Sequence, residues 1–374
     1  MSFDVAIIGA GIVGAACAFR LSLEGFKVVV IEAGDVAGGT TAAGMGHIVV
    51  MDDSEAQFAL TKLSRDLWRK LAADLPSSSE FQNSGTIWVA ADEIEMEEVR
   101  RKNVFFRSRG VNCEILDEKS LVEAEPNLRN GLAGGLRIPD DCVVYQLCAA
   151  KYFIEAAESL GAKTFLGKRV VEISDSDVKL ENGDSIRCRN VINAAGTGSA
   201  ALFGMLKIVR KKGHLVITDR YPGFVKHQLI ELGYLKSAHS ENRDSVAFNV
   251  QPRATEQLLI GSSRQFGSED RSVDHNIVRQ MIERAKTFMP GLKDLSATRI
   301  WTGFRPSSPD NLPYIGKYPG FENVYLAAGH EGLGITTSLG TAELLADEIL
   351  GRDSVIDRKP YSPGRLSILP DADD

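Results

Sequence analysis

A glycine-rich turn near the start of the chain is the feature that most restricts its fold. In "IIGAGIVGAACA", Gly9, Gly11 and Gly14 stand in the order G-x-G-x-x-G. An apolar run at 5–8 precedes them, as in a buried parallel strand, and apolar residues at helical spacing follow over 12–23. The stretch therefore predicts a strand, a tight turn and a helix.

The glycines and a following acid together predict a dinucleotide site. Gly9 suits the tight turn, Gly11 lets a pyrophosphate approach the backbone, and Gly14 lets helix and strand pack closely. A second strand at 27–31 ends in Glu32, 18 positions after Gly14, where an acid meets a ribose hydroxyl. The helix N-terminus would add N–H donors for the phosphates. The alternative, an ordinary βαβ unit without a ligand, accounts for the turn but not for the acid.

Length and charge narrow the class of protein. The chain has 374 residues, more than one hydrophobic core usually organises, so we expect two domains. A net charge of −7 without a basic run argues against nucleic acid or an anionic membrane as the main partner. The first strand starts near residue 3, and no apolar run is long enough to span a membrane. We therefore expect a cytoplasmic protein without a signal peptide.

Cysteine and histidine spacing predicts no metal site. The five cysteines form no C-x-x-C pair and no cluster with histidine, and the six histidines are scattered along the chain. We therefore expect neither a zinc site nor a disulfide framework. Cys17 falls inside the first predicted helix, where a small buried hydrophobic residue is the simplest interpretation.

The nucleotide-binding domain is predicted to be interrupted and later resumed. Charged helical stretches, a strand meander with an Asn182-Gly183 hairpin turn, and a strand-rich region separate its parts. We predict an α/β plus α+β protein, with a discontinuous Rossmann-type cofactor domain and a substrate-binding domain built on an antiparallel sheet. The cofactor domain is expected to take 1–75, 143–214 and 300–374, and the substrate-binding domain 76–142 and 215–299.

In two later segments, too, a predicted strand leads into a turn of small residues. "VINAAGTGS", 191–199, is an apolar strand that runs into small residues, and "VYLAAGHEGLGITTSLGTAELLADEIL", 324–350, reads as strand, glycine-rich turn and long helix. Gly329, Gly332 and Gly334 at the entrance of that helix let the backbone approach something flat or anionic. The nucleotide motif earlier in the chain favours a ligand here over the alternative, a glycine-rich helix entrance with none.

Six motifs, in this order along the chain, resemble the FAD-dependent family of D-amino-acid oxidase, glycine oxidase and sarcosine oxidase. They are "DVAIIGAGIVGAACA", "VVIEAG", "TTAAGMG", "VINAAGTGSA", "WTGFRPSSPDNLPYIG" and "GHEGLGITTSLGTAELLADEI". The resemblance covers nearly the whole chain, and "KKGHLVITD" and "QPRATEQLLIGSSRQF" are most similar to glycine-oxidase-like, cyanide-synthase-like and hydroxyproline-dehydrogenase-like members. It implies FAD as cofactor, a small carboxylated amine as substrate and O2 or another electron acceptor as partner, and a homo-oligomer is one option for the assembly.

The resemblance also implies where FAD binds. The glycine turn would hold the pyrophosphate, Glu32 the adenosine ribose, and the last helix entrance the N1/C2=O edge of the flavin. The implied cofactor contacts are Gly9, Gly11, Gly14, Glu32, Thr40, Thr41, Ala43, Gly44, Met45, Val170, Val171, Ala195, Gly196, Gly332, Leu333, Gly334, Ile335 and Thr336. Relatives with covalent flavin attach it to a cysteine in the C-terminal third. This chain has none after Cys188, so we expect non-covalent FAD.

Arg305, in "WTGFRPSSPDNLPYIG", matches the arginine that binds the substrate carboxylate in this family. A guanidinium fork suits that task, and a structural arginine is the alternative. Hydride transfer from the neutral amine would give an imine that water hydrolyses, so no protein base is required. Met45 and His47 are implied to lie near the flavin and join Arg305 as candidate catalytic residues, although a lone histidine is as often structural. Tyr234 and Phe248 are pocket candidates by neighbourhood only, with a core role as the alternative.

Arg264 favours a substrate with two carboxylates. By the register of "LLIGSSRQF", it stands where glycine oxidases have a methionine. Arg264 is therefore a candidate catalytic residue that would place a second guanidinium at the substrate. Two guanidinium groups predict a dicarboxylic secondary amine such as iminodiacetate, which would be cleaved to glycine and glyoxylate. D-amino acids with an acidic or polar side chain are the alternative substrates. The structural alternative is a strand-end arginine paired with Glu269 or Asp270.

Two departures from the family pattern leave the electron acceptor open. Glu331 and Gly332 occupy the loop in which glycine oxidases have an arginine, and no motif matches the lysine that activates oxygen in sarcosine oxidases. An oxidase that uses O2 is predicted. A D-amino-acid or hydroxyproline dehydrogenase, or a cyanide-synthase-like subunit, that passes electrons to a quinone or partner subunit is the alternative, and a non-catalytic flavin-binding subunit is a third.

Overall fold

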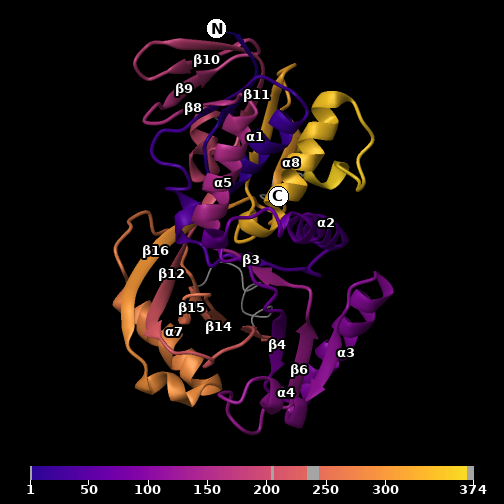
Figure 1. Cartoon of the computed structure of the whole chain (residues 1–374), viewed down its shortest axis with the longest axis vertical. Coiled ribbons are helices and arrows are strands. Elements are labelled where there is room, and N and C mark those ends of the chain that lie inside the picture. Colours follow the sequence, from indigo (N-terminus) through magenta and orange to yellow (C-terminus); the bar gives the residue numbers. More distant parts are fainter. Residues whose placement is uncertain (1, 204–205, 234–243, 369–374) are drawn as a thin grey trace, which may run out of the picture. The chain divides into compact units, whose positions relative to one another are not determined.

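The chain folds into two compact units, each built from separate stretches of sequence (Figure 1). The structure is a computed structural model that describes residues 2–203, 206–233 and 244–368. Unit 1 comprises Met1–Ser79, Tyr145–Arg210 and Arg305–Asp374, and unit 2 comprises Glu80–Val144 and Lys211–Phe304. The domain boundaries expected from the sequence lie two to five residues from these limits.

Unit 1 contains the predicted Rossmann-type sheet. Its strands stand in the order β17-β18-β11-β1-β2-β8, parallel except that β17 runs antiparallel to β18. The bounds are β17 Tyr314–Lys317, β18 Val324–Ala328, β11 Ser185–Asn193, β1 Ser2–Ile8, β2 Val28–Ile31 and β8 Lys163–Phe165. The hairpin of β9 (Val170–Ile173) and β10 (Asp177–Leu180) extends this sheet through β11. β2, β18 and residues 5–8 of β1 are fully buried, so their near-continuous apolar runs are what this position requires, whereas β8 and the first half of β11 are partly exposed.

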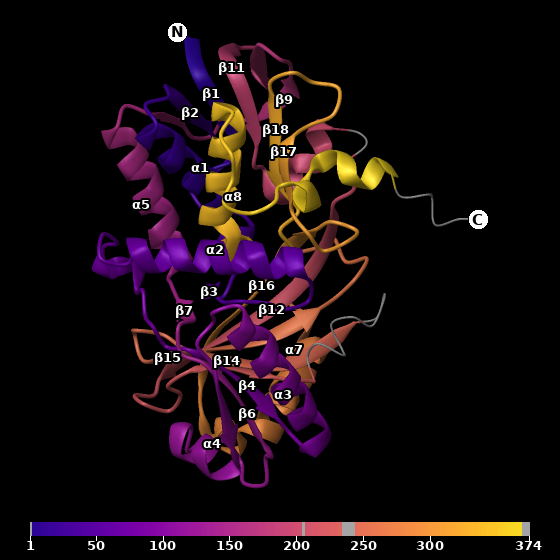
Figure 2. The ribbon, with the colours of Figure 1, turned by 90° about the vertical axis from the view of Figure 1, so that its right-hand side faces the viewer.

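Among the described residues, the helices of unit 1 are α1 (Ile12–Leu23), α2 (Glu55–Leu71), α5 (Gln146–Ser159) and α8 (Gly334–Leu350). Two of these four, α5 and α8, pack on α1, and α2 packs on α8. Small buried residues of α1, such as Ala15 and Ala18, let α5 and α8 approach it closely, and Figure 2 shows these three helices side by side. Phe153 of α5 links the layers, because its ring stacks on Phe19 at 5.7 Å and meets Trp68 of α2 at 5.4 Å. Cys17 is buried, as expected, and burial raises its pKa to about 12.

Unit 2 is built on an eight-stranded sheet with the order β16-β12-β15-β14-β13-β4-β6-β5. The bounds are β16 Ala297–Ser307, β12 Val209–Arg220, β15 Gln257–Arg264, β14 Ser245–Pro252, β13 Gln228–Glu231, β4 Thr86–Ala90, β6 Gly134–Ile138 and β5 Glu114–Asp117. The expectation of a purely antiparallel sheet is wrong at one place, since β13 and β4 are parallel. These two strands come from different stretches of unit 2, with part of unit 1 between them in the chain, so no hairpin dictates their direction.

The core of unit 2 lies on one face of this sheet. Residues of α4 (Glu118–Ala124) and α7 (His275–Phe288) belong to this core, and α7 packs on β14 and β15. Helix α3 (Glu93–Ser108) packs on β4 and β6 and contributes no residue to it. Phe248 belongs to this core, because it is fully buried and stacks on Phe288 at 4.6 Å with nearly parallel rings. The core role is therefore correct for Phe248, and Tyr234 lies outside the described residues.

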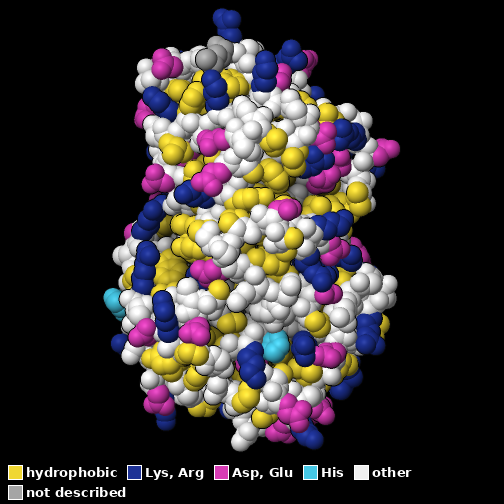
Figure 3. All heavy atoms as spheres, viewed as in Figure 1, with side chains coloured by type: hydrophobic (Ala, Val, Ile, Leu, Met, Phe, Trp, Pro, Cys, Tyr) yellow, Lys and Arg dark blue, Asp and Glu magenta, His cyan; other side chains and the backbone are white. Residues whose placement is uncertain are grey.

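Short elements complete the two units. They are β3 (His47–Ile48), β7 (Cys142–Val143), η1 (Thr40–Ala43), η2 (Ser77–Ser79), η3 (Gly196–Leu202), η4 (Pro290–Asp294), η5 (Lys359–Tyr361) and η6 (Pro363–Ile368). On the face that Figure 3 shows, acidic and basic side chains are both scattered among hydrophobic and uncharged ones. Among the described residues, we find no helix with the length and apolar character that crossing a bilayer requires.

Truncating Phe248 tests the core of unit 2. Phe248→Ala is expected to lower the free energy of unfolding by about 3–5 kcal/mol, because it removes a fully buried ring and leaves a cavity against Phe288. Denaturant unfolding followed by circular dichroism measures the change. Val104→Ala, on the exposed face of α3, serves as control and should stay within about 0.5 kcal/mol of the parent.

Candidate cofactor and substrate site

Gly9 and Gly14 bring three elements of unit 1 into contact at the predicted cofactor turn. Gly9 has a φ of +104°, and a methyl group built on it would lie 2.6 Å from the Ala194 carbonyl oxygen at the end of β11. A methyl group on Gly14 would overlap the Gly9 carbonyl oxygen. Only glycine fits at either position, so the start of α1 lies directly on the ends of β1 and β11. This is the cradle that the G-x-G-x-x-G spacing predicts.

The loop with η1 closes over the N-terminus of α1. The Thr41 hydroxyl accepts a hydrogen bond of 3.1 Å from the Ile12 amide, and a methyl group on Gly11 would lie 3.3 Å from the same hydroxyl. Gly196 of the second small-residue turn approaches the Thr40 side chain. Thus the segments that begin at Gly9, Thr40 and Ala195, which the sequence assigned to one cofactor, lie together in unit 1.

Glu32 is oriented at the end of β2 by the backbone. Its two carboxylate oxygens accept hydrogen bonds from Ala10 and Gly34, each at 2.8 Å, and a carboxylate has further lone pairs to accept ribose hydroxyls. The Lys168 amide donates to the Glu32 carbonyl at 2.9 Å, which brings the chain that leads into β9 beside this acid. Val170 there is buried, whereas the Val171 side chain is about half exposed, so any adenine contact of Val171 falls to its backbone.

The other end of the predicted cofactor site is assembled from the 43–48 segment and the start of α8. The Thr336 hydroxyl donates to the His47 carbonyl at 2.8 Å, and a methyl group on Gly44 would lie 2.7 Å from Ile335. The Gln146 amide nitrogen donates to the Gly44 carbonyl at 2.8 Å. The segment containing Ala43, Met45 and His47 is therefore fixed against the helix whose N-terminus was predicted to face the flavin.

The start of α8 keeps donors for a ligand. Its N-cap residue, Leu333, has no side chain that could accept a hydrogen bond from the first turn. Partial positive charge at such a helix end stabilises an anion or a negatively charged ring edge. The residues Gly332 to Thr336 therefore fit the flavin contact that the sequence assigned to them.

Arg305 lies against the entrance of α8. A methyl group on Gly332 would lie 3.6 Å from both Cδ and Nε of Arg305. The strand around it is fixed, because Ser307 forms a β-bridge with His330 and the Glu331 amide donates to the Pro306 carbonyl at 2.7 Å. The candidate carboxylate-binding residue and the candidate flavin-binding helix end thus belong to one arrangement within unit 1.

His330 is a residue that sequence reasoning missed. It is buried beside Arg305's strand, its Nε2 lies 3.0 Å from the Thr341 hydroxyl of α8, and burial lowers its pKa to about 3. The ring is therefore neutral at physiological pH and acts as a packed hydrogen-bonding group rather than a charge. Gln146 was missed as well, and in both cases the partner lies in another element that a local pattern does not reveal.

Arg264 is the last residue of β15 in unit 2, where its backbone stands opposite Ser245 of β14. Asp270, one of the two acids considered as its partner, forms an ion pair of 3.2 Å with Lys212. Arg264 and Arg305 belong to different units, so their joint action on one substrate stays a prediction.

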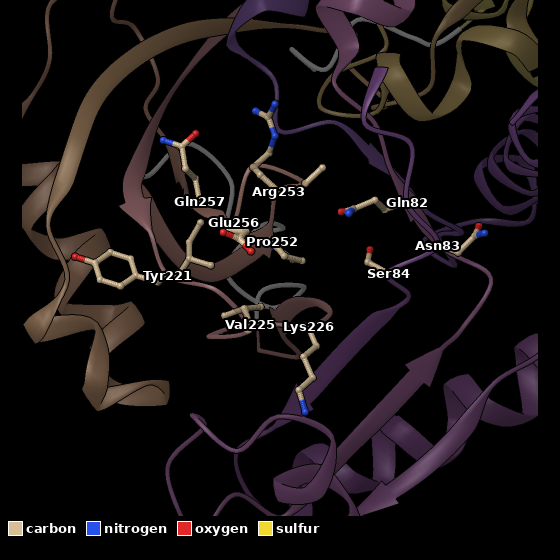
Figure 4. Close-up of a pocket in the computed structure, with 13 residues that line it drawn as sticks. Gln82, Asn83, Ser84, Tyr221, Val225, Lys226, Pro252, Arg253, Glu256 and Gln257 are labelled. Atoms are coloured by element: carbon tan, nitrogen blue, oxygen red, sulfur yellow. The ribbon is translucent and has the colours of Figure 1, made fainter. Parts of the chain in front are cut away.

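Unit 2 also has a polar cavity of about 440 Å³ that contains none of the predicted site residues. Figure 4 shows Gln82 and Ser84 across this cavity from Arg253 and Pro252. Arg253 is held there by an ion pair of 2.7 Å with Glu80. Part of its lining, from Pro252 to Leu258, falls in the "QPRATEQLLIGSSRQF" segment that carries the family resemblance, but none of these residues was predicted to form a site.

Comparison with known proteins decides the family. A family model described as FAD dependent oxidoreductase, DAO, matches residues 4–348. The chain belongs to this family. Its FAD-dependent character and oxidoreductase class follow, in agreement with the glycine cradle, the Glu32 carboxylate and the open start of α8. The predicted fold, a Rossmann-type FAD domain with a second domain, is confirmed.

Several relatives match this chain over nearly its whole length. A glycine oxidase of Geobacillus kaustophilus is 29% identical over 96% of both chains, and its crystal structure superposes with a TM-score of 0.87 over 97% of this chain and 99% of the other. A hydrogen cyanide synthase subunit of Pseudomonas aeruginosa is 26% identical over 99% of this chain and 98% of its own. An iminodiacetate oxidase of Chelativorans sp. shares the fold, with a TM-score of 0.81 and 21% identity over 96% and 99% of the two chains. The protein is an FAD-dependent oxidoreductase, and glycine oxidases are among the proteins to which it is similar.

Gly14→Ala tests the cradle directly. The added methyl group overlaps the Gly9 carbonyl, so α1 must shift away from β1, and we expect at least a tenfold loss of FAD affinity with destabilisation of about 1–3 kcal/mol. Flavin absorbance per protein after dialysis, titration with FAD and thermal unfolding measure these effects. In the control Leu23→Ala, at an exposed position near the far end of the same helix, FAD binding should be retained.

Proposed function

We propose that this flavoprotein oxidises the C–N bond of a small amino acid or N-substituted glycine whose carboxylate is bound by Arg305. The observation that carries the proposal is the packing of Arg305 against Gly332, at the entrance of the helix whose N-terminus suits the flavin. The similarity to a glycine oxidase supports the proposal, because glycine is an amine that carries a carboxylate. Met45 and His47 are proposed to lie at the flavin ring, on the segment held by Thr336.

In this reaction the main role of the protein is to position the substrate. Bound FAD supplies a two-electron acceptor, and the substrate loses a hydride from Cα and a proton from nitrogen to become an imine, which water hydrolyses. Arg305, as a planar fork, would hold the carboxylate by two hydrogen bonds and so limit which C–H faces the acceptor. Orientation of this kind can supply much of a rate enhancement without a general base. The flavin is proposed to be bound without a covalent link, since no cysteine follows Cys188.

The finer proposal is a dicarboxylic secondary amine, with iminodiacetate as the best candidate. It rests on Arg264, which stands by register where glycine oxidases have an apolar methionine. One more guanidinium than glycine needs implies one more carboxylate. The iminodiacetate oxidase named above shares the fold at 21% identity, which makes this substrate compatible with the fold and no more. Cleavage would give glycine and glyoxylate.

O2 is proposed as the electron acceptor, and the full-length match to a hydrogen cyanide synthase subunit favours a partner subunit or quinone as the second candidate. Anaerobic mixing with a panel of amines separates these functions. Bleaching of the flavin by iminodiacetate or glycine, with peroxide formed on admission of air, is the expected result. Bleaching without peroxide would assign the dehydrogenase function, and a flavin that no amine reduces would overturn the proposal.

Arg305→Lys is expected to retain FAD and lose substrate affinity. One point charge replaces a fork, so a loss of about 1.5–3 kcal/mol, or a roughly 10- to 150-fold rise in KM, is expected. Steady-state kinetics with glycine and sarcosine measure it. Arg299→Lys, an exposed position on the same strand, is the matched control. An unchanged kcat/KM for Arg305→Lys would remove Arg305 from the site.

Arg264→Met, which restores the glycine oxidase residue, is expected to act on one substrate class. It should weaken the binding of iminodiacetate by about 2–5 kcal/mol, the usual effect of removing one partner from a desolvated charge pair. The binding of glycine and sarcosine, which have a single carboxylate, should hardly change. Equal slowing of mono- and dicarboxylates, or a wild type that prefers sarcosine, would show that the second arginine does not select the substrate.

A further inference from the structure

Helix α2 lies across one end of α8 within unit 1 (Figure 2). Ser64 and Trp68 of α2 are both fully buried and, being four residues apart, lie on one face of that helix. The Ser64 hydroxyl accepts a hydrogen bond of 3.0 Å from the Gly340 amide, and the Trp68 Nε1–H group donates one of 3.2 Å to the Ile335 carbonyl. This face of α2 is therefore hydrogen-bonded to the backbone of α8 as well as packed on it.

Gly340 sets how closely the two helices approach. A methyl group on Gly340 would lie 3.0 Å from Cδ1 of Leu60 and 3.1 Å from Cβ of Ser64. The absence of a side chain there lets α2 come near enough for Trp68 to reach the first turn of α8. The Trp68 ring is held from its other side by Phe153 of α5, with 5.4 Å between the ring centres.

The Ile335 carbonyl receives more donors than the helix requires. In an α-helix this carbonyl accepts from the amide four residues further on, that of Leu339. The Ser338 hydroxyl donates to it as well, at 3.0 Å, so that Trp68 is a third donor. A buried indole N–H needs an acceptor, but this need does not explain the choice of a carbonyl that two other groups already use.

The peptide unit with this carbonyl also carries an amide at the open start of α8. The first hydrogen bond inside the helix runs from the Thr337 amide to the Leu333 carbonyl, at 2.8 Å. The Thr336 amide, which shares its peptide unit with the Ile335 carbonyl, therefore has no acceptor inside the helix. Hydrogen bonds in a chain polarise one another, so donors on the carbonyl make the N–H of the same unit a stronger donor.

We propose that Trp68 is a positioning residue for the flavin, which strengthens the Thr336 amide, through the Ile335 carbonyl, as a donor to the edge of the flavin that becomes negative on reduction. This inference rests on the proposed function, in which the start of α8 faces the flavin. A donor directed at developing charge stabilises the reduced cofactor more than the oxidised one. The donors at the Ile335 carbonyl thereby raise the reduction potential of bound FAD.

Two variants that each remove one donor test this inference. Trp68→Phe keeps a ring against Phe153 and loses the N–H, and Ser338→Ala loses the hydroxyl from a helix that alanine favours. Each variant should bind reduced FAD about fivefold less tightly relative to oxidised FAD, the size of one net hydrogen bond. This change corresponds to a reduction potential about 20 mV more negative, which equilibration of the FAD-loaded protein with a reference dye measures.

Leu60→Ala is the matched control for loosened packing. It removes a fully buried side chain between α2 and α8 without touching the Ile335 carbonyl, so the Tm should fall while the reduction potential stays at the parent's value. A potential that is unchanged in both donor variants, or one that Leu60→Ala lowers equally, would overturn the inference. If Trp68→Phe does not retain FAD, Ser338→Ala decides the question alone.

Failure of the proposed function is distinguishable from failure of this inference. The reduction potential is measured without substrate, so it reports on the flavin environment alone. Failure of the proposed function would appear instead as a wild-type flavin that no amine reduces.

Discussion

The contact between Gly14 and the Gly9 carbonyl is the constraint on which the organisation of unit 1 depends. A helix that starts this close to its strand is aligned with the ends of β1, β2 and β11 at once, since the Gly9 amide bonds to Ile31 and the Ala194 amide to Ile8. The helix N-terminus predicted to bind phosphate, the acid predicted to bind ribose (Glu32) and the second small-residue turn are thereby fixed relative to one another. The remaining loops need only close over a cradle that the strands already define.

The parts of the site that depend on local geometry could be predicted from the sequence. Glycine is required at Gly9, where φ is positive, and at Gly14, where the backbone of the turn comes too close for a side chain. Both positions can therefore be recognised in the sequence, and so can Glu32 at the end of the next strand. The turn before α8 is visible for the same reason at Gly329, whose φ is +78°. Thr41 was identified through resemblance to a family, and its bond to the Ile12 amide gives the physical reason.

The parts that depend on pairing between distant elements could not be predicted. The parallel register of β4 and β13 and the hydrogen bond of His330 to Thr341 each join residues whose neighbours are set by the sheet or helix packing. A single glutamine such as Gln146 has no local pattern that separates a surface residue from a buried donor. Arg305 and Arg264 differ in how they can be recognised. Arg305 lies within a motif of the family, whereas Arg264 stands out only when this one position is compared with the methionine of glycine oxidases.

The parallel pairing of β4 with β13 has a consequence for how the chain is made. β4 is complete at residue 90, but its neighbour begins only at residue 228, after the ribosome has synthesised much of unit 1. At about 5–20 residues per second, one edge of β4 waits roughly 7–30 s for its partner. Unpaired edges of apolar strands are prone to intermolecular pairing, so nascent chains at this length are the stage at which a chaperone matters most.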